Sequence, residues 1–134
     1  MLEQGHGNIV NTASAQGLRG GRNNFMYGTA KAGVITLTKS LALTWARDGI
    51  RVNCIAPRLF ATHRALEEYE ARGRRIPAGR VGRTSEIGPL VVYLASEASS
   101  YITGGVFIID GGALAGGYAP TGYTPVTEPT LTCH

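Results

Sequence analysis

The feature that most constrains this chain is a long helical pattern flanked by two short segments of strand character. Apolar residues recur at three- and four-residue steps over residues 24–47, which predicts a single long helix. Asn24 is a candidate cap for its start and Gly49 a candidate left-handed cap for its end. Residues 8–13 and 50–56 are short, apolar and partly β-branched, as in buried strands. A strand, a helix and a strand of this size form a βαβ unit, which predicts parallel strands in a sheet covered on both faces.

Three further segments complete the predicted domain. Residues 84–96 combine a capping pattern with an apolar stripe and predict a second helix, and residues 106–109 predict a third buried strand. Residues 61–80 are mostly polar and predict a substrate lid. Residues 115–134 alternate glycine and proline with threonine and tyrosine, and they lack the apolar surface that would offset the entropy cost of ordering. We therefore expect one domain over residues 1–114 and a disordered tail after it.

Size and charge narrow the classes of function. The chain has 134 residues, 43% of them hydrophobic, which suits one globular domain. Its net charge of +4 comes from cations that are scattered, apart from three arginines within residues 72–75. No aromatic residues interleave with that cluster, which argues against nucleic-acid binding and favours an anionic ligand or partner.

Cysteines, histidines and hydropathy indicate no metal site, disulfide or membrane span. Cys54 lies in an apolar strand and Cys133 in the tail, so we expect neither a disulfide nor a zinc site. His6 and His63 match no metal-ligand spacing. The first residues lack the pattern of a secretory signal, and no apolar stretch has the roughly eighteen residues that a membrane span needs. We therefore expect a soluble, cytoplasmic protein without a metal.

Three polar side chains are placed to meet at one small molecule. Ser14 follows the first predicted strand, and Tyr27 and Lys31 stand four residues apart in the long helix. Side chains at that spacing share one helical face, with the ammonium near the phenol. If the strand and the helix pack side by side, all three converge. Taken singly, each of these residue types is more often an ordinary surface or capping residue.

Five blocks, in their order and spacing, resemble the C-terminal half of a classical short-chain dehydrogenase/reductase (SDR). They are Asn-Ile-Val-Asn-Thr-Ala-Ser at 8–14, Tyr-Gly-Thr-Ala-Lys at 27–31, Gly-Ile-Arg-Val-Asn at 49–53, Ala-Pro at 56–57, and Thr-Gly through Asp-Gly-Gly at 103–112. The resemblance implies the C-terminal part of a Rossmann-like, doubly wound parallel α/β sheet that lacks the first βαβ, cofactor-binding half.

The resemblance also implies a chemistry, namely hydride transfer between NAD or NADP and an alcohol or carbonyl substrate. It assigns Tyr27 as the general acid/base, with the phenolate favoured by the Lys31 ammonium and by the positive nicotinamide. Ser14 would hydrogen-bond the substrate oxygen as charge develops there. Lys31 would in addition bind the nicotinamide ribose.

The resemblance places the nicotinamide against the loop after the second strand. Candidate cofactor-binding residues in that loop are Pro57, Phe60 (through its backbone) and Thr62. Arg58 stands where the family usually has glycine, and it adds bulk and charge beside the expected nicotinamide. The acidic residue that selects NAD or NADP belongs to the part of the family fold upstream of these blocks, so the sequence does not indicate the preference.

No glycine-rich strand, turn and helix of the kind that holds a dinucleotide pyrophosphate precedes Gly7. We therefore expect a truncated half of an NAD(P)-dependent short-chain oxidoreductase, inactive alone and homo-oligomeric in its full-length form. The alternative is a non-catalytic remnant that acts as a binding or dimerisation module through the long helix. Unpaired strand edges and an exposed apolar face would also promote self-association.

Overall fold

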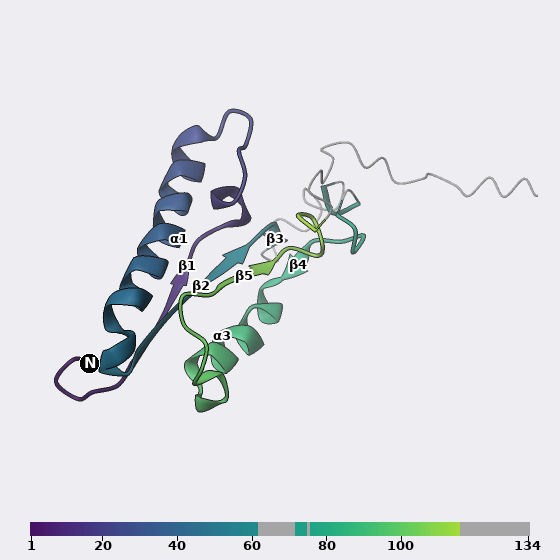
Figure 1. Cartoon of the computed structure of the whole chain (residues 1–134). Helices are drawn as coiled ribbons and strands as arrows, with labels where there is room; N and C mark the ends of the chain where they lie inside the picture. The colour runs from purple at the N-terminus through teal and green to yellow at the C-terminus, as the bar shows by residue number, and fades with distance from the viewer. Residues whose placement is uncertain (62–71, 75, 116–134) are drawn as a thin grey trace, which may run out of the picture.

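The computed structural model describes residues 1–61, 72–74 and 76–115 (Figure 1). Its main sheet has three parallel strands in the order β1-β2-β5, and β3 and β4 form a small parallel pair. Within these residues the helices and strands are β1 (Gly7–Thr12), α1 (Phe25–Trp45), β2 (Ile50–Pro57), β3 (Phe60–Ala61), β4 (Gly82–Arg83), α3 (Gly88–Ala95) and β5 (Val106–Ile109). A short 3₁₀ turn, η1 (Ala15–Gly17), lies between β1 and α1. The predicted βαβ unit is confirmed.

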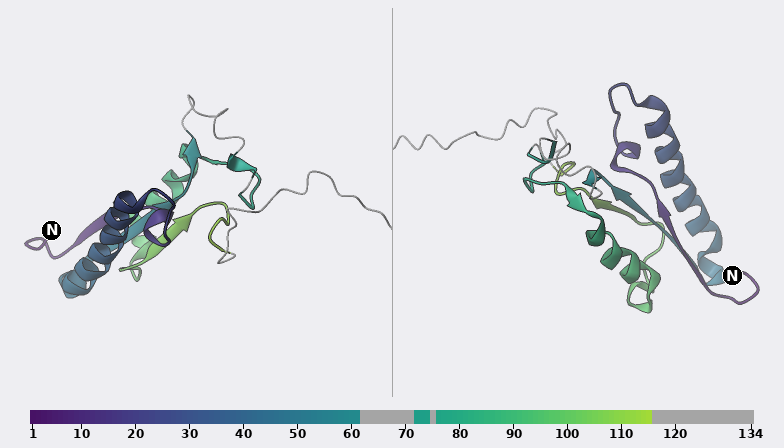
Figure 2. Two further views of the ribbon diagram at one scale, coloured as in Figure 1. Left: turned by 90° about the horizontal axis from the view of Figure 1, so that it is seen from above. Right: turned by 180° about the vertical axis from the view of Figure 1, so that it is seen from behind.

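Helices cover both faces of the sheet. Side chains alternate between the two faces along each strand, so neighbouring residues of one strand contact different helices. On one face, Ile50 and Val52 of β2 pack with Ala42 of α1. On the other face, the amide of Asn8 donates to the carbonyl of Leu94 in α3 over 2.7 Å. Figure 2 shows α1 and α3 on opposite sides of the strands. β2 is the central strand and is buried along most of its length.

The two predicted caps of α1 have different outcomes. Gly49 adopts the left-handed conformation at φ +71°, but it caps the 3₁₀ turn that follows α1, η2 (Ala46–Asp48), where its backbone N–H donates to the carbonyl of Ala46 over 3.3 Å. The prediction for Asn24 is wrong in mechanism, since its side chain makes no capping bond and instead donates to the side-chain oxygen of Gln16. A tertiary contact between the η1 segment and α1 has replaced the local cap.

The second helix is shorter than the sequence pattern predicts. Residues 84–86 form a separate 3₁₀ turn, and α3 begins only at Gly88. The side chain of Glu86 accepts from the backbone N–H of Arg83 over 2.7 Å and pairs with Arg80 at 2.7 Å. These bonds hold the chain in the tighter turn before α3 starts.

Two polar residues of β2 attach the 96–105 connection to the face of the sheet that α3 covers. The guanidinium of Arg51 donates to the carbonyls of Leu94 and Ser96 and to the hydroxyl of Ser99, over 3.0, 2.9 and 2.8 Å. Asn53 donates to the carbonyl of Ile102 over 2.8 Å and accepts from the N–H of Gly105 over 3.0 Å. These bonds position the chain that enters β5.

Parts of the predicted lid and all of the tail after residue 115 lie outside the described residues. From the described part of the lid, Ala61 and Ile76 pack in a small apolar cluster with Val81 and Ala113. None of the described helices is both long and apolar enough to cross a membrane.

Candidate active site at the carboxyl edge of the sheet

The carboxyl ends of the three strands lie side by side, and the candidate residues follow them. The β1–β2 ladder ends with Thr12 opposite Ile55, and the β2–β5 ladder ends with Pro57 opposite Ile109. The N–H of Ala13 donates to the carbonyl of Ile55 over 2.9 Å, which extends the first ladder by one residue. In open parallel sheets, ligands bind outside this edge of the strands.

Ser14 is the N-cap residue of η1. Its backbone is extended, and its Oγ accepts a hydrogen bond from the N–H of Gln16 over 3.2 Å. The residue is only 7% exposed. Within the described residues its hydroxyl donates to no acceptor, so the hydroxyl proton is available to an oxygen atom of a bound molecule.

Tyr27 and Lys31 share one face at the start of α1. The Lys31 ammonium donates to the carbonyl of Thr12, at the end of β1, over 3.0 Å. The same nitrogen lies 5.7 Å from the centre of the Tyr27 ring, within the range of a cation–π contact. Tyr27 is 46% exposed, so its phenol is accessible to a ligand.

Close packing brings the Ser14 segment against this helix. A Cβ at Gly17 would stand 2.7 Å from the carbonyl carbon of Lys31, and a Cβ at Gly28 would stand 3.2 Å from the carbonyl oxygen of Gln16. Only glycine at Gly17 allows η1 to lie this near the backbone of α1. The structure therefore brings the elements that carry Ser14, Tyr27 and Lys31 together at one edge of the sheet.

The loop after β2 contains the predicted cofactor residues. Pro57 is the last residue of β2, and Phe60 belongs to β3, where its ring fills the space in which Gly82 would otherwise carry a Cβ. Leu59 has a positive φ of 51°, an uncommon conformation for a residue with a side chain. Thr62 lies outside the described residues.

The electrostatics of this loop were not evident from the sequence. Burial is the largest cause that lowers the pKa of Arg58, nearby Arg19 lowers it further, and Asp110 partly offsets both. The Asp110 carboxylate accepts from the N–H groups of Gly112 and Leu114 over 2.8 and 2.7 Å. An Asp-Gly-Gly sequence is a recognisable signal for such a turn, whereas no sequence signal brings Arg19 close to Arg58.

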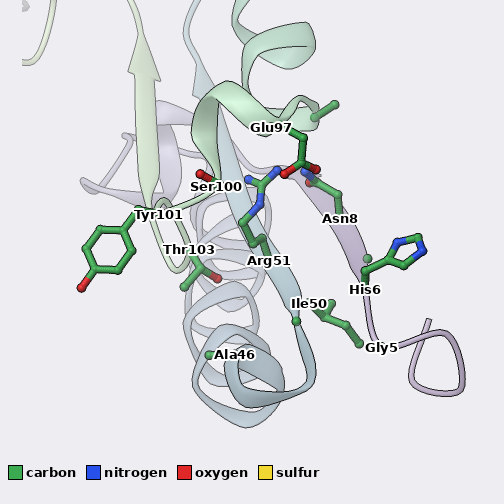
Figure 3. A pocket seen from close by; sticks show the side chains of 13 residues that line it. Gly5, His6, Asn8, Ala46, Ile50, Arg51, Glu97, Ser100, Tyr101 and Thr103 are labelled. Atoms are coloured by element: carbon green, nitrogen blue, oxygen red, sulfur yellow. The ribbon is translucent and has the colours of Figure 1, made fainter.

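A cavity lies at the opposite, amino-terminal edge of the sheet and is separate from this site. It has a volume of about 740 Å³ and is lined by residues from the starts of β1 and β2 and from the 95–103 segment (Figure 3). Arg51 and Asn8 line it, but their side chains hydrogen-bond the end of α3. None of the predicted catalytic or cofactor residues that the structure describes lies in its lining.

The residues at the carboxyl edge fit one end of a nicotinamide dinucleotide. An ammonium has three donors, and among the described residues Lys31 uses one of them on Thr12, which leaves donors suited to the hydroxyls of a ribose. The Gly-x-Gly-x-x-Gly pattern that holds the pyrophosphate does not occur in this sequence. The donor set therefore fits the nicotinamide–ribose end and not the pyrophosphate.

The parallel sheet, its two helical layers and the polar group at its carboxyl edge define a Rossmann-like, doubly wound α/β protein. A family model described as "Enoyl-(Acyl carrier protein) reductase" matches residues 1–113. The chain belongs to the short-chain dehydrogenase/reductase family.

Individual relatives agree with this assignment. The chain is 43% identical over 121 residues to 2-dehydro-3-deoxy-D-gluconate 5-dehydrogenase of Bacillus subtilis, covering 86% of this chain and 48% of the relative. It is 42% identical over 124 residues to 2-keto-3-deoxy-L-fuconate dehydrogenase of Xanthomonas campestris, with 84% and 41% covered. A gluconate 5-dehydrogenase from Burkholderia cenocepacia, solved in complex with NADP and tartrate, superposes with a TM-score of 0.79 at 35% identity, covering 85% of this chain and 47% of that one. The chain thus spans about half the length of the relatives it matches.

Proposed function

We propose that this chain carries the catalytic half of an NAD(P)-dependent oxidoreductase that acts on a small alcohol or carbonyl compound. The observation that supports this most is the position of the Lys31 ammonium, bonded to the carbonyl of Thr12 at 3.0 Å and 5.7 Å from the Tyr27 ring. An ammonium in this place stabilises negative charge that develops on a phenol oxygen during proton transfer. Ser14 supplies a hydroxyl donor from the neighbouring strand end.

The proposed roles follow from these donors and acceptors. In the reducing direction a C–H bond forms at the carbonyl carbon, the π-electron pair moves to the oxygen, and that oxygen takes the proton of Tyr27. Ser14 donates a hydrogen bond to the same oxygen, and Lys31 binds ribose hydroxyls. The nicotinamide, when bound, supplies the hydride in this direction and accepts it in the reverse direction. Loop residues Pro57, Phe60 and Thr62 are proposed to contact the nicotinamide.

We further propose that the chain by itself binds the whole dinucleotide weakly and turns over poorly. The pyrophosphate-binding glycine pattern is absent from its sequence, so most of the affinity for the dinucleotide must come from elsewhere. Within the chain, residues 1–114 would form the partial catalytic domain, with residues 61–80 as its substrate lid. The free, buried thiol of Cys54 suits a reducing compartment such as the cytoplasm.

The test uses reduced nicotinamide mononucleotide, which carries the nicotinamide and its ribose without the adenylate half. We expect saturable binding to the 134-residue chain by NMR and a large loss of affinity in Lys31→Ala. The matched control is Lys39→Ala, which removes the same charge from an exposed position on the same helix. Tyr27→Phe should retain binding, because the proposed role of the phenol is proton transfer. Equal binding by Lys31→Ala and Lys39→Ala would contradict the proposed site.

A second candidate function is a non-catalytic binding or dimerisation module. It is favoured by apolar side chains that α1 exposes, namely Phe25, Met26, Leu37 and Leu43. Such a surface suits contact with a second protein or a second copy of the chain. Sedimentation of the wild type and of Leu43→Ser tests the dimer. We expect a dimeric wild type and a weaker dimer for the variant, and a monomeric wild type would exclude dimerisation through α1.

A further inference from the structure

Arg58 is a cationic residue at the carboxyl edge of the sheet, and none of the roles proposed above involves it. Arg58 follows directly after β2, and its backbone N–H donates to the carbonyl of Ile109, at the end of β5, over 3.0 Å. The β1–β2 ladder reaches Ala13, so Ser14 follows the neighbouring strand on the other side. Arg58 therefore leaves the middle strand, β2, at the same carboxyl edge of the sheet at which Ser14 follows β1.

Negative charge only partly balances the guanidinium of Arg58: Asp110 raises its pKa, but burial and Arg19 lower it by more. Arg58 is half-buried, and within the described residues its side chain makes no hydrogen bond or ion pair. Asp110 is the nearby acid, but both of its oxygens accept backbone N–H groups of the following turn. Arg19 adds positive potential, since it lowers the pKa of Arg58 in the same direction as burial does.

A half-buried guanidinium without a partner is costly unless an anion binds to it. It has five N–H donors in a planar fork, a geometry that matches the two oxygens of a carboxylate or phosphate. The attraction between a guanidinium and an anion is stronger when both are partly shielded from water than on an open surface.

We propose that Arg58, in the positive potential of Arg19, binds an oxyanion beside the Ser14, Tyr27 and Lys31 group. This inference rests on the proposed function, because that function brings two sources of such an anion to this edge: a carboxylate of the substrate or the phosphate of the nicotinamide nucleotide. If the source is the substrate, the enzyme selects hydroxy acids and keto acids over neutral alcohols and ketones.

The first test measures binding rather than turnover. The 134-residue chain is titrated at low ionic strength with D-gluconate, with its uncharged counterpart D-glucitol, and with inorganic phosphate, and the arginine side-chain N–H signals are followed by NMR. We expect saturable binding of gluconate or phosphate and none of glucitol. Arg58→Gln should weaken anion binding by about tenfold or more, as expected for the loss of charge-assisted hydrogen bonds.

Matched variants separate a specific site from a general effect of charge. Arg47→Gln removes the same charge from an exposed position beyond the far end of α1 and should leave binding unchanged. Arg58→Lys keeps the charge but not the planar fork, and it should bind with intermediate affinity; it also serves if Arg58→Gln folds poorly. Equal weakening by Arg58→Gln and Arg47→Gln, or no anion binding by the wild type, would overturn the proposal.

The probes also identify the source of the anion. Binding of gluconate in preference to phosphate supports the substrate carboxylate, and the opposite preference supports the nucleotide phosphate. The result does not depend on hydride transfer. An Arg58-dependent anion site would remain if reduced nicotinamide mononucleotide failed to bind through Lys31, and the two proposals can therefore fail separately.

Discussion

Replacement of Arg51 by methionine tests whether a charged side chain in β2 fastens the 96–105 connection to the sheet. The guanidinium donates four hydrogen bonds, of 3.0, 2.8, 3.4 and 2.9 Å, to Leu94, Ser99, Ile102 and Ser96. Methionine retains an unbranched apolar stem but removes all of these donors.

The expected cost is smaller than the sum of the bonds. At about 1.5–3 kcal/mol for a hydrogen bond to a charged group, four bonds would total about 6 kcal/mol or more. Each acceptor carbonyl, however, keeps a second donor: Asn8 for Leu94, the hydroxyl of Ser99 for Ser96, and Asn53 for Ile102. Because no carbonyl is left bare, we expect the free energy of unfolding to fall by about 3 kcal/mol.

Urea denaturation of the whole chain, followed by circular dichroism, measures this change. With an m value of about 1.5 kcal/mol/M, the midpoint should fall by about 2 M. Amide exchange should quicken first in residues 96–105, since three of the four lost bonds end there. Arg47→Met, at an exposed position, should change stability by less than about 0.5 kcal/mol. A loss for Arg51→Met below about 1 kcal/mol would refute the view that this network holds the connection in place.

Two further predictions concern backbone conformation and pH. Gly49→Ala should destabilise the fold by about 1–2 kcal/mol, because Gly49 has φ +71° and its Cβ would collide with the carbonyl oxygen of Gly5; Gly33→Ala, in open space on α1, should instead stabilise by about 0.5–1 kcal/mol. Thermal unfolding of both variants checks the opposite signs. The hydrogen bond from Arg80 and, after it, the backbone N–H of Arg83 lower the pKa of Glu86 from its ordinary value of 4.5 to about 2, so the stability that they contribute is complete above pH 4.5 and is lost as the pH falls towards 2. NMR titration of the carboxyl carbon measures that pKa, and Arg80→Gln should return it towards 4.5, whereas an unchanged value would exclude the ion pair as its cause.

Local patterns in the sequence were sufficient to predict the elements of the main sheet. Helical periodicity over residues 24–47 corresponds to α1, and the apolar segments at 50–56 and 106–109 correspond to β2 and β5. The left-handed Gly49 was also predictable, because a glycine after a helical pattern is a local signal. The predicted role of Asn24 failed because its amide found a partner in Gln16, a contact that depends on how η1 packs on α1.

By itself, the sequence determined the βαβ unit and the identity of the residues at its carboxyl edge, since periodicity and spacing are properties of neighbouring residues. Only the tertiary structure decided which of those residues meet. It brought Lys31 to the carbonyl of Thr12, and it set Arg58 near Arg19 and Asp110. It also showed that Arg51, a charged residue in an apolar strand, donates hydrogen bonds to the segment that follows α3. These contacts join segments far apart in the chain, and strand register and helix packing, which no local pattern encodes, determine them.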